Sequence, residues 1–529
     1  MVAIEASRLR DEHSGAPGDE TGVEGMADHL LSFGADDAIA FVSGAARCTY
    51  GELRQAVATL TQRLVDEEWP SGTPVALIAP NGPFWIAAYI ATMQAGLVTV
   101  PLPTVLTTDE AIARLRWVGA RAAFVGGRAG RVLGDAVSPD VRVYTEEATI
   151  EQPVSWGDRP LGRVRLDDDA AYLFTSGTTG DPRAVVLTHG NIRTNTASIL
   201  GYLDLTADDR VLVVLPFSYV FGASLLHTHL RVGATLVDQA AVAYPETTVR
   251  LLAEERCTVF AGVPSVFHTL LRNTSFSRAE LPHLRIIQQA GGRLPPALLH
   301  ELMKAHPQAR VFVMYGQTEA TARLSVLDPR LLLSKPGSIG RGIPGVRLAV
   351  IGDDGQPVAA GEIGEIYATG ANVSRGYLRD PQATDRKMPG GVLHTGDLAT
   401  VDEEGYIYVV DRAEDFIKSW GYRVASQEVE EIAMEVTDLV AAAAVGVPDD
   451  AAGERIALMV VMRAGALATP ADILAHCRSR LPKYSVPAEV HVAERLPTNA
   501  NGKIVKSDVR RIIRDVALGG HGDERNADG

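Results

Sequence analysis

Short runs of β-branched and aliphatic residues alternate with helical patterns along most of the chain, and this alternation limits the fold more than any other feature. The predicted strands are residues 75–79, 98–102, 122–126, 211–216, 234–238, 258–263, 284–290 and 310–316. Helical patterns lie between them, for example at 84–94, 246–256 and 295–305. Apolar strands joined by crossover helices form parallel sheets that are covered on both faces. We therefore expect an α/β fold that binds its ligand at the carboxyl ends of the strands.

Charge and composition exclude several classes of function. The 529 residues include 50 Lys and Arg against 65 Asp and Glu, and this net charge of −15 argues against a nucleic-acid partner. Residues 69–108 carry no charge, but prolines and glycines divide them into pieces too short to cross a bilayer, so no membrane insertion is expected. The N-terminus lacks a signal-peptide pattern, and three cysteines are too few for a disulfide framework. These features predict a cytoplasmic protein.

The texture of the sequence changes from about residue 338. Glycine-rich turns separate short alternating strands there, which predicts a small barrel or meander. After Asp411 a smaller α+β unit is expected, with strands at 441–447, 455–462 and 488–493 and helices at 426–436, 470–480 and 507–515. The predicted domains are a flexible tail at 1–25, a large domain at 26–411, a smaller one at 412–517 and a second tail at 518–529.

The densest local signal is the segment Leu173–Arg183, which reads Leu-Phe-Thr-Ser-Gly-Thr-Thr-Gly-Asp-Pro-Arg after an apolar strand. Backbone N–H groups and hydroxyls in such a loop donate hydrogen bonds to a polyphosphate, and Arg183 supplies positive charge. The Gly-Lys-Ser/Thr of a Walker A loop is absent, which disfavours a P-loop kinase or ATPase. The alternative interpretation is a plain surface loop of small residues.

This segment resembles the phosphate loop of the adenylate-forming superfamily, which includes acyl-CoA synthetases, aryl-CoA ligases, luciferases and peptide-synthetase adenylation domains. The family loop continues as Pro-Lys-Gly, whereas this chain has Pro182-Arg183-Ala184. Arginine keeps the charge without being equivalent to lysine, and alanine removes backbone freedom. The resemblance implies a large N-terminal domain of two doubly wound sheets plus a small β-barrel, with a smaller, mobile α+β C-terminal domain.

Four further segments match the family in order and spacing, so the resemblance spans about residues 30–515. In Tyr315-Gly-Gln-Thr-Glu319 it implies that the aromatic ring packs on adenine, that Thr318 contacts the α-phosphate and that Glu319 binds Mg²⁺. Asp397 of Thr395-Gly-Asp would accept hydrogen bonds from the ribose hydroxyls. Arg412 would contact ribose or phosphate, and Glu414 occupies the hinge between the domains. The implied nucleotide and thiol contacts are Thr175, Ser176, Gly177, Thr178, Thr179, Gly180, Arg183, Gly291, Gly292, Arg293, Tyr315, Gly316, Asp397, Arg412, Lys418 and Gly421.

The C-terminal segment Leu496–Ile504 resembles the motif that carries the family's adenylation lysine, which places that role on Lys503. A mobile lysine between the carboxylate and the α-phosphate stabilises charge on the bridging oxygens. The family works in two poses of the C-terminal domain. One brings the lysine into the site, and the other presents the face of Lys418–Gly421 to a pantetheine thiol. The implied catalytic residues are thus Lys503, Glu319 and Thr318, with ATP, Mg²⁺ and coenzyme A or phosphopantetheine as cofactors.

The predicted substrate is a small-molecule carboxylic acid without an α-amino group. Amino-acid-activating members carry an Asp where this chain has Gly222, and a buried ammonium without that counter-ion is costly. Tyr219 stands where many acyl-CoA synthetases have a His. The small side chains of Gly222 and Gly291 suggest room for a long or polycyclic acyl group. The candidate acid-binding residues are Tyr219, Phe221, Gly222, Val263, Pro264, Gln289, Gly291 and Thr321.

The favoured function is an AMP-forming acyl-CoA ligase, and three alternatives stay open. The acceptor thiol is either coenzyme A or the phosphopantetheine of an acyl carrier protein. The Arg183-Ala184 departure also allows an enzyme specialised for thiolation of supplied acyl-AMP. The fourth reading is a non-catalytic adenylate sensor, which the presence of both Lys503 and Glu319 opposes. The sequence leaves the identity of the acid and the formation of a homodimer undecided.

Overall fold

The structure is a computed structural model that describes residues 25–127, 141–146, 164–175, 183–239, 244–449, 451–463, 465–498 and 504–519. The chain divides into two compact units. The first comprises Met1–Ala349 and Tyr367–Thr395, and the second comprises Val350–Ile366 and Gly396–Gly529. The boundary expected at residues 411 and 412 stays a prediction. Residues 1–24 and 520–529, which make up most of the two predicted tails, lie outside the described residues.

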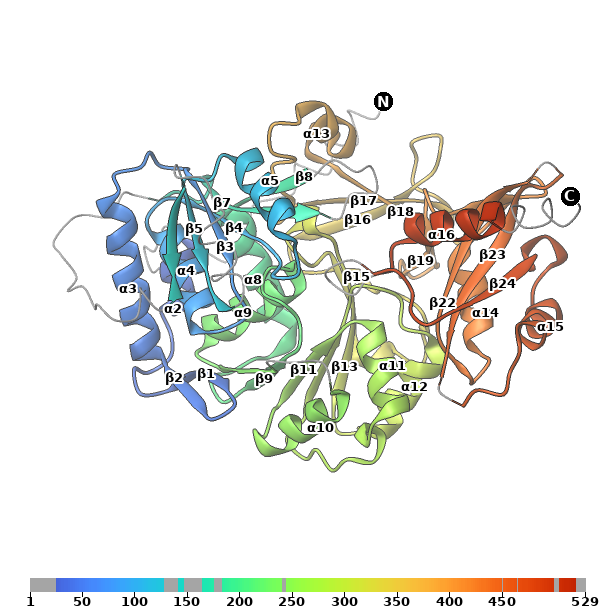
Figure 1. Cartoon of the computed structure of the whole chain (residues 1–529), viewed down its shortest axis with the longest axis horizontal. Coiled ribbons are helices and arrows are strands. Elements are labelled where there is room, and N and C mark those ends of the chain that lie inside the picture. Colours follow the sequence, from blue (N-terminus) through green and yellow to red (C-terminus); the bar gives the residue numbers. More distant parts are fainter. Residues whose placement is uncertain are drawn as a thin grey trace, which may run out of the picture. The chain divides into compact units, whose positions relative to one another are not determined.

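A six-stranded sheet in the first unit confirms the first group of predicted strands (Figure 1). In sheet order its strands are β6 (Arg142–Thr145), β5 (Ala122–Val125), β3 (Pro74–Ile78), β4 (Val98–Pro101), β7 (Asp169–Thr175) and β8 (Arg183–Thr188). All neighbours are parallel except β7 and β8, which form an antiparallel pair. The uncharged residues 69–108 thus supply two neighbouring strands of this sheet, β3 and β4, and the buried helix between them.

A nine-stranded sheet completes the α/β part of the first unit. In sheet order its strands are β15 (Arg341–Gly342), β14 (Ser325–Leu327), β13 (Arg310–Tyr315), β12 (Ile286–Gln289), β11 (Val259–Gly262), β9 (Arg210–Val213), β10 (Thr235–Asp238), β1 (Ile39–Ser43) and β2 (Ala46–Thr49). The strands from β13 to β1 are parallel, and β14, β15 and β2 pair antiparallel at the edges. Two large sheets are what the resemblance implied.

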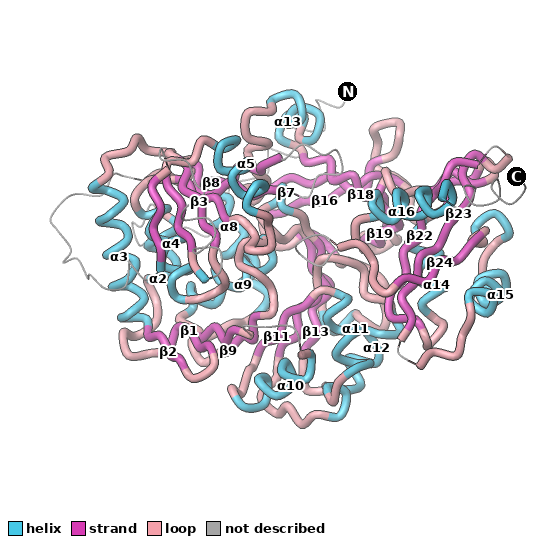
Figure 2. Tube along the Cα trace, viewed as in Figure 1, coloured by secondary structure: helices cyan, strands magenta, loops and turns pink. Residues whose placement is uncertain are grey.

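Helices cover the sheets on both faces, as expected for a doubly wound fold (Figure 2). The helices of the first unit are α2 (Met26–Leu31), α3 (Tyr50–Asp66), α4 (Pro83–Gln94), α5 (Thr108–Val118), α8 (His189–Leu203), α9 (Val220–Val232), α10 (Pro245–Glu254), α11 (Pro264–Asn273), α12 (Pro296–Ala305) and α13 (Pro381–Lys387). Capping boxes at Thr49, Thr107 and Thr188 start α3, α5 and α8, because each threonine satisfies a backbone N–H that the helix leaves free.

Successive side chains of β3 pack into two different hydrophobic cores, one on each face of the six-stranded sheet. Val75 and Leu77 pack in the core that α4, α8 and α9 share with both sheets, whereas Ala76 and Ile78 pack against α5 on the other face. Successive side chains of a strand point to opposite faces, so a strand buried on both sides is apolar throughout. Helix α4 lies within that shared core and is buried all round, and its Trp85 is only 1% exposed.

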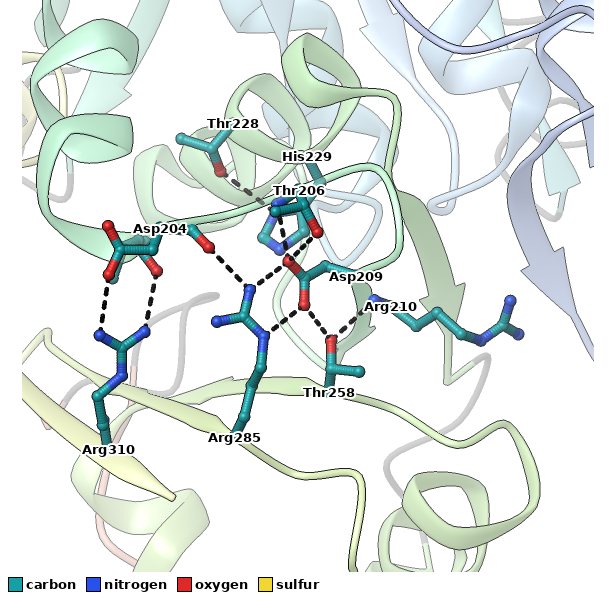
Figure 3. Close-up of polar contacts among 10 residues, drawn as sticks. Asp204, Thr206, Asp209, Arg210, Thr228, His229, Thr258, Arg285 and Arg310 are labelled. Atoms are coloured by element: carbon teal, nitrogen blue, oxygen red, sulfur yellow. Dashed lines mark hydrogen bonds and ion pairs between the residues drawn. The ribbon is translucent and has the colours of Figure 1, made fainter. Parts of the chain in front are cut away.

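A polar cluster ties together the amino ends of strands in the nine-stranded sheet (Figure 3). Asp209 directly precedes β9, is 2% exposed, and accepts hydrogen bonds from Arg285 through Nε at 2.8 Å and through Nη2. It also accepts from Thr258 Oγ1 at 2.6 Å and from the Thr206 N–H at 2.8 Å. Thr258 and Arg285 directly precede β11 and β12, so one carboxylate aligns three parallel strands. This cluster lies at the ends opposite to those that bind ligands.

The second unit contains the predicted α+β fold. Its sheet runs β21 (Tyr422–Val424), β20 (Ile417–Ser419), β23 (Gly453–Met462) and β22 (Leu439–Asp449), and β24 (Glu489–Ala493) also pairs with β23. Its helices are α14 (Ser426–Met434), α15 (Pro470–Arg480) and α16 (Lys506–Gly519). Among the described residues, no helix combines the length and the apolar character needed to cross a membrane.

The predicted small barrel or meander is a four-stranded sheet with its strands in chain order. These are β16 (Val346–Ile351), β17 (Gly364–Gly370), β18 (Leu393–Val401) and β19 (Ile407–Arg412). A sheet whose neighbouring strands follow one another in the chain is a meander, so the meander is the one of the two predicted alternatives that forms. The three strands β16, β17 and β18 contribute residues to both units.

Candidate active site

Two paired strands flank the glycine- and threonine-rich segment. Strand β7 ends at Thr175, β8 begins at Arg183, and these two residues are direct partners in the antiparallel pair. The segment between Thr175 and Arg183 therefore starts and ends at two paired positions of the six-stranded sheet. The residues between them that carry the predicted phosphate contacts are outside the described part of the chain, so their roles stay predictions: Ser176, Gly177, Thr178, Thr179 and Gly180.

Arg183 and Ala184 differ from the family loop, and the structure gives each a local role. The Arg183 guanidinium lies 5.9 Å from the centroid of the Tyr377 ring, and its Nε is 4.0 Å from Asp380 Oδ2. Ala184 is fully buried in β8, and its carbonyl accepts a hydrogen bond from the Leu378 N–H at 2.8 Å. The alanine methyl fills core space that glycine would leave empty, so Ala184 fits a buried strand position.

Glu319 is held by a side chain that the motifs do not contain. It lies in the 3-10 turn Thr318–Ala320 that follows β13, and its Oε1 accepts a hydrogen bond from the Tyr377 hydroxyl at 2.7 Å. Burial and the neighbouring carboxylate raise the pKa of Tyr377, so the hydroxyl stays protonated and donates. Tyr377 therefore links Glu319 to Arg183, which lies over its ring. Sequence reasoning missed Tyr377 because no local pattern marks a residue 58 positions away as a partner.

The arrangement around Glu319 fits Mg²⁺ delivered with a triphosphate. Mg²⁺ prefers oxygen ligands, and in nucleotide sites it uses one or two carboxylates together with substrate phosphates and water. Tyr377 engages one oxygen of Glu319, which leaves the other for a metal. No group of three or more His, Cys, Asp or Glu side chains suited to a metal occurs among the described residues.

Replacing Tyr377 with phenylalanine is expected to lower kcat/KM for MgATP about tenfold, because a hydrogen bond to a charged group is worth about 1.5–3 kcal/mol. The measurement is acid-dependent ATP–pyrophosphate exchange over a range of Mg²⁺ concentrations. Tyr144→Phe is the matched control, since the Tyr144 hydroxyl donates to Glu67 at 2.8 Å in the same way but at β6. An equal loss in both variants would show that the effect is not specific to Glu319.

The turn after β13 is strained where the family motif predicts nucleotide contacts. A Cβ on Gly316 would lie 1.9 Å from the Ala322 carbonyl oxygen, so only glycine fits there. Thr321 has φ +66°, a rare conformation for a β-branched residue, and its Oγ1 donates to the Asn372 carbonyl at 2.7 Å. Such strain is found at functional sites where neighbours enforce it. Tyr315, at the end of β13, accepts a hydrogen bond from the Leu324 N–H through its carbonyl at 2.8 Å.

The turn after β12 leaves one buried polar atom unpaired. Gln289 donates through Nε2 to the Gly292 carbonyl at 2.7 Å, but its buried Oε1 has no hydrogen-bond partner among the described residues. Buried acceptors are normally satisfied, so this oxygen is available to a donor on a ligand. Arg293 is exposed next to this turn. The turn that contains Gly291, Gly292 and Arg293 therefore lies at the carboxyl end of a parallel strand, and its contact with the nucleotide stays a prediction.

Several of the candidate acid-binding residues lie together near the start of α9. A Cβ on Gly291, which has φ +86°, would lie 2.9 Å from Val263 Cγ1 and 3.5 Å from the Tyr219 hydroxyl. Phe221 is buried in the first turn of α9. Residues from three loops, after β9, β11 and β12, thus converge at the carboxyl ends of adjacent strands, where the fold predicts a ligand.

The interpretation of Gly222 as space for an acyl group is wrong. A Cβ there would lie 2.1 Å from the Pro216 carbonyl oxygen and 3.1 Å from that of Leu215, so backbone occupies the space. Glycine is required at this position because the preceding loop packs directly on α9. The position also has no room for the aspartate side chain that would pair with an α-ammonium.

In the second unit, Asp397 and Arg412 are direct partners in the β18–β19 pair. Arg412 Nε lies 3.3 Å from Asp397 Oδ1, and the Asp397 side chain is only 8% exposed. Arg412 also reaches Glu414, with Nη1 3.6 Å from Oε1. The two residues expected to bind ribose and phosphate are therefore adjacent, and the hinge candidate Glu414 is exposed beside them.

A buried ion cluster anchors the hinge segment. Asp411 is fully buried, and one oxygen accepts hydrogen bonds from the N–H and hydroxyl of Ser426 at the start of α14. Lys506 donates to the same hydroxyl, and its Nζ lies 2.9 Å from Glu430 Oε1. Lys506 follows the predicted catalytic Lys503 by three positions, and Lys503 itself lies outside the described residues. The cluster therefore joins the hinge, α14 and the segment that carries the lysine.

Lys418 and Gly421 belong to the β20–β21 hairpin, which turns through Trp420 and Gly421. Both turn residues have positive φ, +53° and +81°, as a two-residue type I′ turn requires. A bulky residue rarely adopts this conformation, and Trp420 is 61% exposed. Lys418 is exposed on the same hairpin, and Tyr422 stacks on Tyr484 with ring centroids 4.1 Å apart.

Comparison with known proteins agrees with this arrangement. A family model described as AMP-binding enzyme matches residues 33–378, and one described as AMP-binding enzyme C-terminal domain matches residues 428–503. A feruloyl-CoA synthase of Amycolatopsis sp is 36% identical over 88% of this chain and 94% of its own length. A 2-succinylbenzoate–CoA ligase of Geobacillus kaustophilus is 30% identical over 91% of this chain and 96% of its own length.

Solved structures give the same result. The structure of ATP-bound MatB from Rhodopseudomonas palustris matches with a TM-score of 0.83 at 26% identity, over 93% of this chain and all of that one. The o-succinylbenzoate CoA synthetase MenE from Bacillus subtilis, solved with an acyl-adenylate intermediate, has a TM-score of 0.83 at 26% identity, over 92% and 98%. The chain therefore belongs to the AMP-binding enzyme family and is an acyl-CoA synthetase of the adenylate-forming superfamily.

Proposed function

We propose that the protein is an AMP-forming acid–thiol ligase that activates a non-amino carboxylic acid as acyl-AMP and transfers it to the thiol of coenzyme A. The observation that carries the proposal is the Tyr377 hydroxyl bound to Glu319 at 2.7 Å, with Arg183 of the phosphate-loop strand over the same ring. The carboxylate that we propose as metal ligand and the cation that we propose as phosphate ligand therefore both contact the Tyr377 side chain. Phosphoryl chemistry needs both, because the reacting groups are anions.

In the first half-reaction, a carboxylate oxygen of the acid attacks the α-phosphorus of ATP. The bond between that phosphorus and the bridging oxygen breaks, and pyrophosphate leaves. Mg²⁺ bound to the phosphates neutralises their charge when it is present. Glu319 would hold the metal, Thr318 would position the α-phosphate, and Arg183 with residues 175–180 would bind the departing phosphates. Lys503 approaches the bridging oxygens and stabilises the charge that develops there.

In the second half-reaction, the thiol sulfur attacks the acyl carbon, loses its proton and displaces AMP. AMP is a good leaving group, whereas the oxide of a free acid is not. Asp397 and Arg412 hold the ribose and phosphate through both steps. The hinge at Glu414 rotates the part of the chain that follows it and brings Lys418 and Gly421 to the pantetheine arm.

The acid carries no α-amino group, because the chain has Gly222 where amino-acid-activating enzymes carry an aspartate. The names of the relatives include ferulate and 2-succinylbenzoate, which are aromatic acids without an amino group. We propose coenzyme A as the acceptor and the cytoplasm as the location. An acyl carrier protein as acceptor and a homodimer as the assembly are alternatives that the experiment below and a mass measurement in solution test.

A panel of carboxylic acids tests the proposal. Acid-dependent ATP–pyrophosphate exchange is measured first, and thioester formation with coenzyme A or a holo acyl carrier protein second. We expect exchange and thioester formation with coenzyme A for the same acids. Thioester formation only from supplied acyl-AMP would support the enzyme specialised for the second half-reaction. Tight AMP binding without either activity would identify an adenylate sensor and overturn the proposal.

A further inference from the structure

Arg323 is a fully buried cation that the reaction described above does not use. It lies between the Glu319 turn and β14 and is 2% exposed, among the largest completely buried side chains. Two amides fix its backbone, because its carbonyl accepts hydrogen bonds from Asn195 Nδ2 at 3.0 Å and from Asn372 Nδ2 at 2.9 Å. The position of this side chain is therefore set by the surrounding fold.

The guanidinium of Arg323 is poorly compensated. Its central carbon lies 4.1 Å from the centroid of the Phe221 ring, and its Nε donates to Met314 Sδ at 3.3 Å. A thioether is a weak acceptor, and Nη2 has no hydrogen-bond partner among the described residues. None of the ion pairs found in the described part of the chain includes Arg323. Burial lowers its pKa, and this effect is opposed by Tyr202, which is hydrogen-bonded to the guanidinium, and by the neighbouring Tyr219.

A buried cation without a carboxylate is costly, and buried charges are normally paired or bound to a ligand. The ring and the sulfur offset only part of that cost. A guanidinium carries five donors, and an anionic or carbonyl oxygen is the partner that its geometry matches best. The unused donor is thus suited to an oxygen atom that this chain does not supply.

The residues around Arg323 are the candidate acid-binding residues. Phe221, whose ring faces the guanidinium, starts α9 two residues after Tyr219. The Tyr219 hydroxyl lies beside Gly291 and Val263, the other walls of the same cluster. Thr321, two residues before Arg323, adopts the strained turn described above. The guanidinium therefore belongs to the part of the first unit that would hold the acyl group.

We propose that Arg323 determines acid specificity by donating a hydrogen bond to a second oxygen acceptor on the acyl group, remote from the reacting carboxylate. The substrate class is then a carboxylic acid with a distal carboxylate, keto or phenolic oxygen, of which the carboxylate pairs most strongly. This inference rests on the proposed function, since it concerns the acid that the same site activates. Arg323 forms no bond in the reaction, and its role is to select the substrate.

Matched pairs of acids test the proposal. Each pair differs only in the distal oxygen: adipate with hexanoate, and 3-(4-hydroxyphenyl)propanoate and 3-(4-carboxyphenyl)propanoate with 3-phenylpropanoate. The readout is kcat/KM in acid-dependent pyrophosphate exchange for wild type and Arg323→Met. We expect wild type to prefer the oxygen-bearing member by about 10- to 100-fold, and Arg323→Met to abolish that preference while it retains activity on the apolar member. The comparison within each series identifies the kind of oxygen that is bound.

Two controls make the outcome decisive. Arg310→Met removes another arginine that lies over a phenylalanine, with its guanidinium carbon 5.6 Å from the Phe312 centroid, and should leave the preference unchanged. If Arg323→Met does not fold, Arg323→Lys keeps the charge and should weaken the preference only in part. Equal losses on both members of a pair, or a wild type without preference, would overturn this proposal. A wild type inactive with every acid would instead count against the proposed function.

Discussion

Lys503→Ala is expected to lower acid-dependent ATP–pyrophosphate exchange by about 10²- to 10³-fold, because a charge-stabilising donor aimed at a transition state contributes that much. Thioester formation from supplied acyl-AMP is expected to change little, since the proposed mechanism uses the lysine only in the first pose. Both rates are measured on the same enzyme preparation with one acid. An interaction made only in one transition state affects only the step that passes through it.

Lys304→Ala serves as the control for this experiment, because Lys304 is an exposed lysine near the end of α12. It should leave both half-reactions unchanged. Equal losses in exchange and in thiolation for Lys503→Ala would contradict the two-pose mechanism. A loss confined to thiolation would mean that the lysine acts in the second half-reaction.

Asp209→Asn is expected to have the largest effect on stability, lowering the free energy of unfolding of the first unit by about 3–5 kcal/mol. The substitution puts a neutral amide at the buried position 209, where it keeps only part of the hydrogen bonding with Arg285, whose side chain is 34% exposed. Urea unfolding is followed by tryptophan fluorescence, to which the buried Trp85 of the first unit contributes. Asp204→Asn is the matched control, because its pair with Arg310 has a carboxylate that is 72% exposed and should contribute about 0–1 kcal/mol.

The same carboxylate predicts a pH dependence. Burial acts to raise the pKa of Asp209, but hydrogen bonds from Arg285, Thr258 and Thr206 outweigh it, and the pKa is lowered. A lowered pKa in the folded state means that this stabilisation is complete above the pKa of the unfolded chain, about 3.9. It is lost as the pH falls through the folded-state value. Wild type should therefore lose stability below about pH 4 more steeply than Asp209→Asn, and parallel curves would contradict this account.

The strands and helices of both α/β parts were predictable from local patterns. Apolar runs such as 75–79 and 211–216 become β3 and β9 because a strand buried on both faces needs apolar side chains at every position. Prolines and glycines mark the breaks between elements, as at Pro83, which begins α4. The antiparallel edge strands β14, β15 and β2 were not predicted, because two- to four-residue strands carry too little pattern to recognise.

The candidate site was predictable only where a motif is continuous in the chain. The segments around Thr318 and Asp397 can be recognised in the sequence from the type and order of their residues. Tyr377 and Arg323 contact partners that are far away in the sequence, so no local pattern marks them. Gly222 was misread for a related reason. Its small side chain is visible in the sequence, but only the fold places the Pro216 carbonyl in the space beside it.

The sequence alone determined the fold class, the family and the order of the chemical motifs, because each depends on residues that are close together in the chain. The tertiary structure decided which side chains meet: Tyr377 with Glu319, Lys506 with Ser426, and Arg323 with Phe221. These contacts join residues that are about 60 to 100 positions apart. Their energies come from burial and pairing, which exist only after the chain has folded.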